Sequence, residues 1–313
     1  MSFTIGADPE VFLERNNIPV SSIGKIGGTK YEPIHIQDGI FLQEDNVTVE
    51  YNIPPCETLE EFLRYNQRAL DIIAEKASKL DLKVAIQAAA KMPKEELQDP
   101  QAWVFGCEPD FNVWKMEENP KPKATQWRAA GGHIHIGYEC SNLEKIQLTK
   151  FLDSTLGAIF SLLDPDTKRK KMYGTAGSIR FKPYGIEYRT LSNYWLRHPY
   201  LIATVYETVK HGISYLEKGK DPSIPLSVKT LEAINKRRVK EIMEYINHAQ
   251  MHTGIFPPIM RNLLAKVTYS LIKTDKSLDI DQEVLFNLLG KEDKVPSKGT
   301  LADLLHQKLY QPA

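Results

Sequence analysis

The sequence lacks any hydrophobic run that approaches the roughly 18 apolar residues needed to cross a bilayer. Its first residues, MSFTIGADPEVF, have neither the basic start nor the apolar core of a secretory signal peptide. Cysteine is also scarce: Cys56, Cys107 and Cys140 are odd in number and far apart, which argues against a disulfide framework or a thiolate zinc site. We therefore expect a reduced, cytoplasmic protein that does not enter a membrane.

Net charge and the common nucleotide motifs are missing as well. Forty basic residues balance 40 acidic ones, so no global field favours nucleic acid, although a local basic groove stays open. Neither the P-loop pattern GxxxxGK[ST] nor a strand–GxGxxG–helix unit occurs, so any nucleotide is held by another device. The serine nucleophile elbow GxSxG and the zinc-protease motif HExxH are absent too.

What the sequence has is two kinds of periodicity. Alternating patterns predict strands at about 2–14, 46–53, 103–115, 131–138 and 178–191. Helical spacing predicts helices at about 57–80, 142–163, 198–217, 226–248, 258–273, 281–290 and 300–308. The order favours an α+β fold in which an antiparallel sheet precedes a helical C-terminal third.

Several expected strands carry acids on one face and apolar residues on the other. In the first strand, Ile5 and Val11 oppose Asp8 and Glu10, because side chains alternate along a strand. The acids found on polar faces in this way are Asp8, Glu10, Glu50, Glu108, Asp110 and Glu187. A solvated face would explain any single strand, but six carboxylates brought together repel one another unless cations intervene. An oxygen-rich ligand set favours magnesium or manganese over zinc or copper.

Two histidines share a strand face in the segment GGHIHIGY. His133 and His135 alone would be weak evidence for a metal site. Glycines on both sides of the pair let a ligand or another backbone approach closely. Beside the acidic strands, the pair favours a metal site.

Basic residues that match phosphate oxygens accompany the acids. They are Arg128, Arg180, Lys182 and Arg189. Structural salt bridges are the alternative role for Arg180 and Arg189. The segment IGKIGGTKYEP, with Gly28 and Lys30, is either an ordinary turn or a loop that lays backbone N–H groups and a lysine against an anion.

Five ordered motifs over about 6–196 carry a family resemblance: GADPEVFL, VEYNIPPC, GCEPDF, RAAGGHIHIG and YGIEYR. They resemble the type 2 carboxylate–amine ligases of tailed bacteriophages, in the glutamine synthetase and glutamate–cysteine ligase superfamily. The resemblance implies a curved antiparallel sheet of the glutamine synthetase catalytic type, with helices on its convex face and magnesium and ATP on its concave face. It implies a catalytic domain over 1–220, a helical extension over 221–313 that packs on it, and, for a phage gene, the cytoplasm of the host cell.

Motif positions in the resemblance also imply roles for single residues. The implied metal ligands are Asp8, Glu10, Glu50, Glu108, Asp110, His133 and Glu187. His135 is implied beside the nucleotide or substrate, and Arg189 at the transferring phosphate. We expect Arg180, Lys182 and Arg128 to assist Arg189 in catalysis, and Gly28, Lys30 and Arg180 to bind the nucleotide.

The implied reaction joins a small-molecule or peptide carboxylate to an amine through an acyl phosphate made from ATP. The loop that selects ammonia in glutamine synthetase is not recognisable, so a larger amine is equally permitted. The alternative enzyme is a metal-dependent hydrolase of phosphodiester or peptide bonds that uses the same acids and histidines. A non-catalytic binding protein on the same scaffold is the third hypothesis. The C-terminal helices would shape the acceptor site or a contact between copies of the chain.

Overall fold

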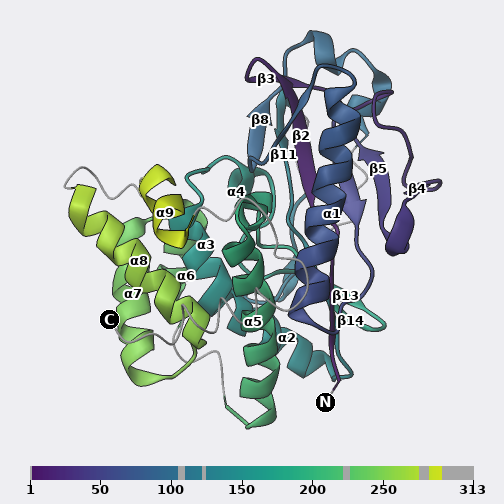
Figure 1. Cartoon of the computed structure of the whole chain (residues 1–313). Helices are drawn as coiled ribbons and strands as arrows, with labels where there is room; N and C mark the ends of the chain where they lie inside the picture. The colour runs from purple at the N-terminus through teal and green to yellow at the C-terminus, as the bar shows by residue number, and fades with distance from the viewer. Residues whose placement is uncertain (1, 105–109, 122–124, 221–225, 275–281, 291–313) are drawn as a thin grey trace.

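The computed structural model describes residues 2–104, 110–121, 125–220, 226–274 and 282–290 (Figure 1). The strands are β1 (Thr4–Ala7), β2 (Glu10–Arg15), β3 (Ile18–Val20), β4 (Ile34–His35), β5 (Phe41–Asp45), β6 (Thr48–Asn52), β7 (Lys83–Ala85), β8 (Ala89–Lys91), β9 (Phe111–Asn112), β10 (Glu117–Glu118), β11 (Trp127–Ala129), β12 (Ile134–Gly137), β13 (Ser178–Lys182) and β14 (Gly185–Tyr188). The helices are α1 (Leu59–Ser78), α2 (Asn142–Leu152), α3 (Ala158–Leu163), α4 (Arg169–Met172), α5 (Pro199–Glu217), α6 (Val228–Lys236), α7 (Val239–His252), α8 (Pro258–Thr274) and α9 (Gln282–Leu289). The predicted α+β class, with antiparallel sheets before the later helices, is confirmed.

Two antiparallel sheets meet at the N-terminal segment. The first has the strand order β1-β12-β14-β13-β9-β10, and the second the order β3-β2-β6-β5-β4 with β7 also paired to β2. Where β1 passes into β2, the Tyr51 N–H donates to the Pro9 carbonyl at 3.2 Å, and the N–H of Glu10, the first residue of β2, donates to the Gly131 carbonyl at 2.9 Å. The backbone around Asp8 and Pro9 therefore joins the two sheets and bonds on both of its sides.

The expected strands are shorter than predicted, for local reasons. The segment 2–14 is interrupted at Asp8–Pro9, where proline has no N–H to donate to a ladder. The segment 46–53 begins only at Thr48, because Asn46 has a φ of 56° and starts the hairpin turn between β5 and β6. The segment 178–191 is a hairpin of β13 and β14, and 103–115 keeps only β9 among its described residues.

The predicted helices are present with refined bounds. Helix α1 starts at a capping box. The Thr58 side chain accepts a hydrogen bond from the Glu61 N–H, and the Glu61 carboxylate accepts one from the Thr58 N–H. The segment 142–163 is α2, a π-helical turn η4 (Asp153–Gly157) and α3. The segment 226–248 divides into α6 and α7 at Arg237, which has a left-handed backbone with a φ of 51°. The helix expected at 300–308 lies outside the described residues.

The later helices gather on one side of the molecule, and α1 runs along the strands (Figure 1). Helix α5 packs against α1, α2 and α8, and α3 against α6 and α7. The Tyr200 hydroxyl donates to the Ile259 carbonyl at 3.0 Å, and the Tyr245 hydroxyl to the Ser154 carbonyl at 2.9 Å. The boundary at residue 220, the curvature of the sheet and helices on its convex face stay predictions. None of the described helices combines the length and the apolar character required to span a membrane.

The core fixes the segment that carries the two histidines, His133 just before β12 and His135 within it. The Trp195 ring, fully buried in η5 (Asn193–Arg197), stacks on Phe62 of α1 with ring centroids 5.8 Å apart. The Trp195 indole N–H donates to the Gly132 carbonyl at 3.1 Å. Burial of these rings removes a large apolar area from water, so the packing that stabilises α1 also places the backbone next to His133.

Close approach of β12 and β14 predicts a specific effect of substitution. Gly185 has a φ of 151°, and a Cβ there would overlap the Ile136 carbonyl oxygen. Gly24 also has a positive φ, 70°, but a Cβ there would meet nothing within 4 Å. We expect Gly24→Ala to lower the free energy of unfolding by about 1 kcal/mol, and Gly185→Ala to lower it by at least about 2 kcal/mol more. Urea unfolding of the two variants measures the difference, and equal losses would contradict the described strand pairing.

Candidate active site

The candidate active site lies where the two sheets meet. In the first sheet His135 is paired with Gly6 on one side and with Glu187 on the other, and Glu187 is paired with Arg180. In the second sheet Glu10 is paired with Glu50. Residues directly opposite on neighbouring strands share a face, so strand register alone brings these side chains together.

One group of side chains, here the His–acid cluster, consists of Asp8, His133, His135 and Glu187. The Asp8 carboxylate lies 3.0 Å from His135 Nε2 and 3.5 Å from His133 Nδ1. His133 Nδ1 is also 3.9 Å from Glu187 Oε1. Asp8, His135 and Glu187 each offer one ligand atom within 4.8 Å of the other two. The cluster therefore has the spacing of a metal site.

Fixed basic residues compensate the acids of this cluster. Glu187 contacts Arg180 Nη1 at 3.2 Å and Lys182 Nζ at 3.0 Å, and it also accepts from the Arg189 guanidinium. Burial and the nearby Asp8 carboxylate would raise the pKa of Glu187, but the basic groups beside it, Arg189 first, hold it at about 2. Burial acts in the same direction on Asp8, yet His135 and His133 keep the pKa of Asp8 well below its usual range.

The two histidines differ in their environment. Burial and the nearby Arg189 guanidinium lower the pKa of His133 to about 4, so its ring is neutral at pH 7 and can offer a ligand nitrogen. For His135, burial lowers the pKa, but the neighbouring Asp8 carboxylate raises it by more, so the net shift is upward. We predicted His133 as the metal ligand and His135 beside the nucleotide. The spacing brings His135 as well as His133 to Asp8, and both assignments stay predictions.

A second group, here the three-acid cluster, consists of Glu10, Asp45 and Glu50. Their carboxylates also offer ligand atoms within 4.8 Å of one another. Burial, and then repulsion from Asp45, raise the pKa of Glu10 to about 7. Burial and the neighbouring acids, Asp8 first, raise the pKa of Glu50 well above its usual range. Unlike Glu187, these acids are not compensated in full by the basic residues around them.

The donor set fits divalent cations of the magnesium or manganese type. His133 Nε2 and Asp110 Oδ2 are buried and make no hydrogen bond within the described part of the chain, whereas His135 Nε2 lies 3.0 Å from the Asp8 carboxylate. Buried polar atoms are nearly always satisfied, so two such atoms at one site indicate a bound partner. Oxygen-rich ligands with a histidine suit magnesium or manganese, and a bound cation would offset the burial and the repulsion that together raise the pKa of Glu10 and Glu50.

Two of the predicted acids belong to the segment before β9. Asp110 is buried, lies 3.5 Å from Arg189 Nε through its Oδ2 atom and accepts from the Asn119 side chain at 3.0 Å. Asp110 therefore joins the site through Arg189. Glu108 and Cys107 lie outside the described residues.

Arg128 has a different environment from the other predicted basic residues. Its guanidinium donates to the Ala102 carbonyl at 2.8 Å and to the Asn46 side chain at 3.0 Å, and it lies over the Trp103 ring. These contacts fix the turn that follows Asp45. The catalytic role that we expected for Arg128 stays a prediction.

The glycine-rich segment around Gly28 binds an anion that belongs to the protein itself. The Glu44 carboxylate accepts from the backbone N–H groups of residues 24–27, at 2.8, 3.0, 2.9 and 2.6 Å in chain order. The Glu44 N–H in turn donates to the Gly28 carbonyl at 3.1 Å. These hydrogen bonds tie the loop to β5, and because the four N–H groups already bind Glu44 they are not open to another anion. Burial raises the pKa of Asp45. The positive charge of Lys30, from the same loop, lowers this pKa in part, but the net shift remains upward.

Sequence reasoning missed Asp45. It lies at the end of β5, and Gln43 of the same strand is paired with Glu50 of β6. The available signal was Asn46, since asparagine readily adopts the positive φ that a tight hairpin requires. A strand ending before Asn46 would have put Asp45 on the face of Glu50.

A cavity of about 400 Å³ adjoins the His–acid cluster at His135. It is lined by Thr4, Gly6, Ala7, Asn52, Ile53, Pro55, His135, Gly137 and Tyr184. The volume is within the range of small-molecule sites, and the lining offers hydroxyl, amide and imidazole groups on an otherwise apolar surface. A ligand in this cavity would reach the acids past His135.

The comparisons with known proteins agree with the motif resemblance. Residues 123–252 match the family described as phage phiEco32-like COOH-NH2 ligase, type 2. The matched segment includes His133, His135, Arg180, Glu187 and Arg189. No curated protein matches the chain in sequence.

Two solved structures are similar to the chain in part. One is a GmaS/ADP complex in conformation 1, with 10% sequence identity, a TM-score of 0.44, and coverage of 88% of this chain and 71% of the other. The second is GmaS without ligand, with 13% identity, a TM-score of 0.41, and coverage of 89% and 73%.

The raised pKa values predict how stability depends on pH without metal. An acid with a higher pKa in the folded state binds a proton more readily when folded, so its contribution is lost as the pH rises. The ordinary pKa of Glu10 is 4.5 and its pKa in the folded protein is about 7, so this stabilisation is lost as the pH rises from 4.5 to about 7. The loss amounts to roughly 3 kcal/mol. We expect Glu10→Gln to reduce this loss, and Mn²⁺ to stabilise the wild type more at pH 7.5 than at pH 5. Urea unfolding in EDTA or Mn²⁺ measures both effects.

The matched control is Glu75→Gln. Glu75 is an exposed acid on α1, and its carboxylate forms a surface ion pair with Lys79 Nζ at 2.8 Å. Its pH curve should follow that of the wild type. His133 opposes the trend, since its lowered pKa makes the fold less stable on acidification, so the difference between Glu10→Gln and wild type is the quantity compared. Identical curves for Glu10→Gln and the wild type would contradict the raised pKa of Glu10, and no effect of Mn²⁺ at pH 7.5 would contradict the metal assignment.

Proposed function

We propose that this chain is a carboxylate–amine ligase that uses ATP to activate a carboxylate as an acyl phosphate, at a site that binds more than one magnesium ion. The match of residues 123–252 to the phage-like type 2 ligase family supports the proposal. The observation that supports the proposal is the pair of acidic clusters at one sheet junction. Basic residues hold the pKa of Glu187 low in one cluster, whereas burial and repulsion between acids raise the pKa of Glu10 and Glu50 in the other. This pattern suits a highly charged substrate that brings cations with it.

The residues divide into metal-binding and phosphate-binding groups. The His–acid cluster, with Asp110, and the three-acid cluster would hold cations that neutralise phosphate oxygens. Arg189, Arg180 and Lys182 surround Glu187 and point their charges at the same place. Preorganised donors of this kind stabilise the charge that develops on a transferring phosphoryl group.

The chemistry has two balanced steps. An oxygen of the substrate carboxylate attacks the γ-phosphorus and ADP leaves, which gives the acyl phosphate. The amine nitrogen then attacks the activated carbonyl, phosphate leaves, and the ammonium proton goes to a base. We assign the base to Asp110 or Glu108, and Asp110 lies within the described site beside Arg189.

The 400 Å³ cavity at His135 would hold the nucleotide or the carboxylate substrate. Both fit by volume, and both would approach Asp8 from the same side. The hydrolase alternative is not favoured, because the matched family consists of ligases. The cytoplasmic location and a contact between copies through the C-terminal helices stay predictions.

A screen of carboxylate and amine pairs with ATP and magnesium tests the proposed reaction. We expect phosphate release that requires both substrates, and a loss of about 10²–10³-fold in kcat for Arg189→Met, because one preorganised donor to the transferring group is removed. Phosphate release by the wild type and the variant, measured in parallel, gives the ratio.

Arg15→Lys serves as the control, since Arg15 is exposed and its guanidinium contacts the Leu80 and Asp81 carbonyls on the surface. Its rate should equal that of the wild type. Metal-dependent cleavage of a phosphodiester or peptide without nucleotide would instead support the hydrolase. Full activity of Arg189→Met would overturn the role of Arg189.

A further inference from the structure

We propose that Asp153 and Arg169, two buried charged residues outside the acidic clusters, are positioning residues that hold Arg189. This inference rests on the proposed function, in which Arg189 meets the transferring phosphate. Asp153 is fully buried and Arg169 is 2% exposed. Buried charges are costly unless each is paired or hydrogen-bonded, so their partners show what they stabilise.

Strand alternation explains how residues behind the sheet can act on Arg189. Arg189 follows β14 and points its guanidinium at Glu187 and Asp110. Its neighbours Tyr188 and Thr190 therefore point to the opposite face. A group that binds both neighbours fixes the backbone from which the Arg189 side chain extends.

Asp153 binds both of these neighbours. Its Oδ1 atom accepts from the Tyr188 hydroxyl at 2.8 Å and from the Thr190 hydroxyl at 3.1 Å. Its Oδ2 atom accepts from the Trp114 indole at 2.6 Å. Asp153 begins the π-helical turn η4, a type of distortion that often occurs at functional sites. One buried carboxylate thus connects the helix to both sides of Arg189.

Arg169 binds the backbone of the same segment. Its Nη1 atom donates to the Thr190 carbonyl at 2.8 Å and its Nη2 atom to the Arg189 carbonyl at 2.9 Å. Its guanidinium also lies 4.5 Å from the centre of the Tyr173 ring, and Arg189 lies 5.8 Å from the same ring. The aromatic ring and the carbonyl bonds together locate Arg189 from two directions.

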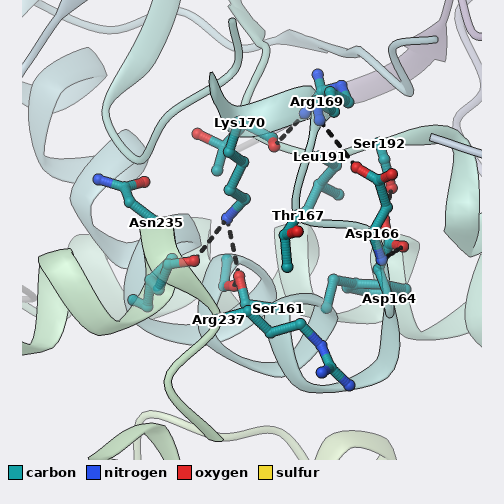
Figure 2. A pocket seen from close by; sticks show the side chains of 14 residues that line it. Ser161, Asp164, Asp166, Thr167, Arg169, Lys170, Leu191, Ser192, Asn235 and Arg237 are labelled. Carbon is teal, nitrogen blue, oxygen red and sulfur yellow. Dashed lines mark hydrogen bonds between the residues drawn. The ribbon is translucent and has the colours of Figure 1, made fainter. Parts of the chain in front are cut away.

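The surroundings of Arg169 allow a conservative replacement. Arg169 lines a cavity of about 30 Å³ that also includes Lys170, Ser161 and Arg237 (Figure 2). Such a volume has room for about two water molecules. Lysine at position 169 would keep the charge and leave space for water, but it would lose the two-pronged contact with the carbonyls. Arg169→Lys is therefore expected to fold.

The test measures the affinity for ATP relative to ADP by calorimetry in the presence of Mn²⁺. We expect the wild type to prefer ATP, and Arg189→Met to lower this preference about tenfold, since a charge-assisted contact to the γ-phosphate is lost. Arg169→Lys and Asp153→Asn should each lower the preference at least about threefold while Mn²⁺ and ADP affinities stay unchanged. A purely structural role would weaken all three ligands together or none.

Arg237→Lys is the matched control, because Arg237 lines the same cavity and donates to the Leu162 carbonyl at 3.3 Å, away from β14. It should keep the wild-type preference. A crystal structure of Arg169→Lys provides the second measurement. Displacement of the Arg189 guanidinium from Glu187, with β14 in register, supports the proposal, and an unmoved Arg189 overturns it. If neither wild type nor Arg189→Met distinguishes ATP from ADP, the proposed function fails, and the crystal structure alone decides the positioning role.

Discussion

Repulsion between carboxylates is the constraint on which the arrangement of this site depends. Strand pairing places Glu10 opposite Glu50, and the hairpin that carries Glu50 also brings Asp45 to the same place. In the first sheet, the same kind of pairing puts Arg180 opposite Glu187. The protein thus offsets repulsion in one sheet with its own basic residues, which lower the pKa of Glu187. In the other sheet, burial first and repulsion from Asp45 second raise the pKa of Glu10. A buried charge left in this condition costs free energy, so its presence indicates a partner that binds there.

Buried charged residues outside the clusters have a common task, which is to hold the backbone next to a site residue. Asn46 and Glu44 flank Asp45 in the sequence. Arg128 binds the Asn46 side chain, and the Glu44 side chain binds the glycine-rich loop. Asp153 and Arg169 act in the same way on the residues around Arg189. Each of these groups makes several hydrogen bonds to atoms distant in sequence, which is how a charge becomes tolerable in a core. Precise placement of side chains on the acidic face thus depends on polar contacts behind and beside it.

Much of the acidic face could be predicted from alternation alone. Asp8, Glu10, Glu50 and Glu187 were assigned to polar strand faces, and the structure brings each of them into one of the two clusters. Alternation failed where the chain leaves the strand geometry, at Pro9 and Asn46, and the second failure concealed Asp45. The contacts of Arg128 and of the loop at 24–27 could not be predicted, because the partners Ala102 and Glu44 come close only through tertiary folding. Local sequence patterns therefore predict the strand face on which a side chain lies, whereas the residue that it contacts can be identified only from the three-dimensional fold.

The break at Asp8–Pro9 has a consequence for the order of binding under the proposed function. It lets Asp8 join the His–acid cluster while Glu10, two residues later, joins the three-acid cluster. The fixed charges of Arg180, Lys182 and Arg189 would attract a triphosphate to the first cluster, but the acids of the second, which basic residues offset only in part, would repel it at short range. Repulsion of this kind falls only when the acids bind protons or a cation, and at neutral pH a divalent cation is the stronger competitor for a three-carboxylate site. Under the proposed function, the three-acid cluster would therefore bind its cation before, or together with, the nucleotide, and nucleotide affinity would depend on metal even though the basic residues are already in place.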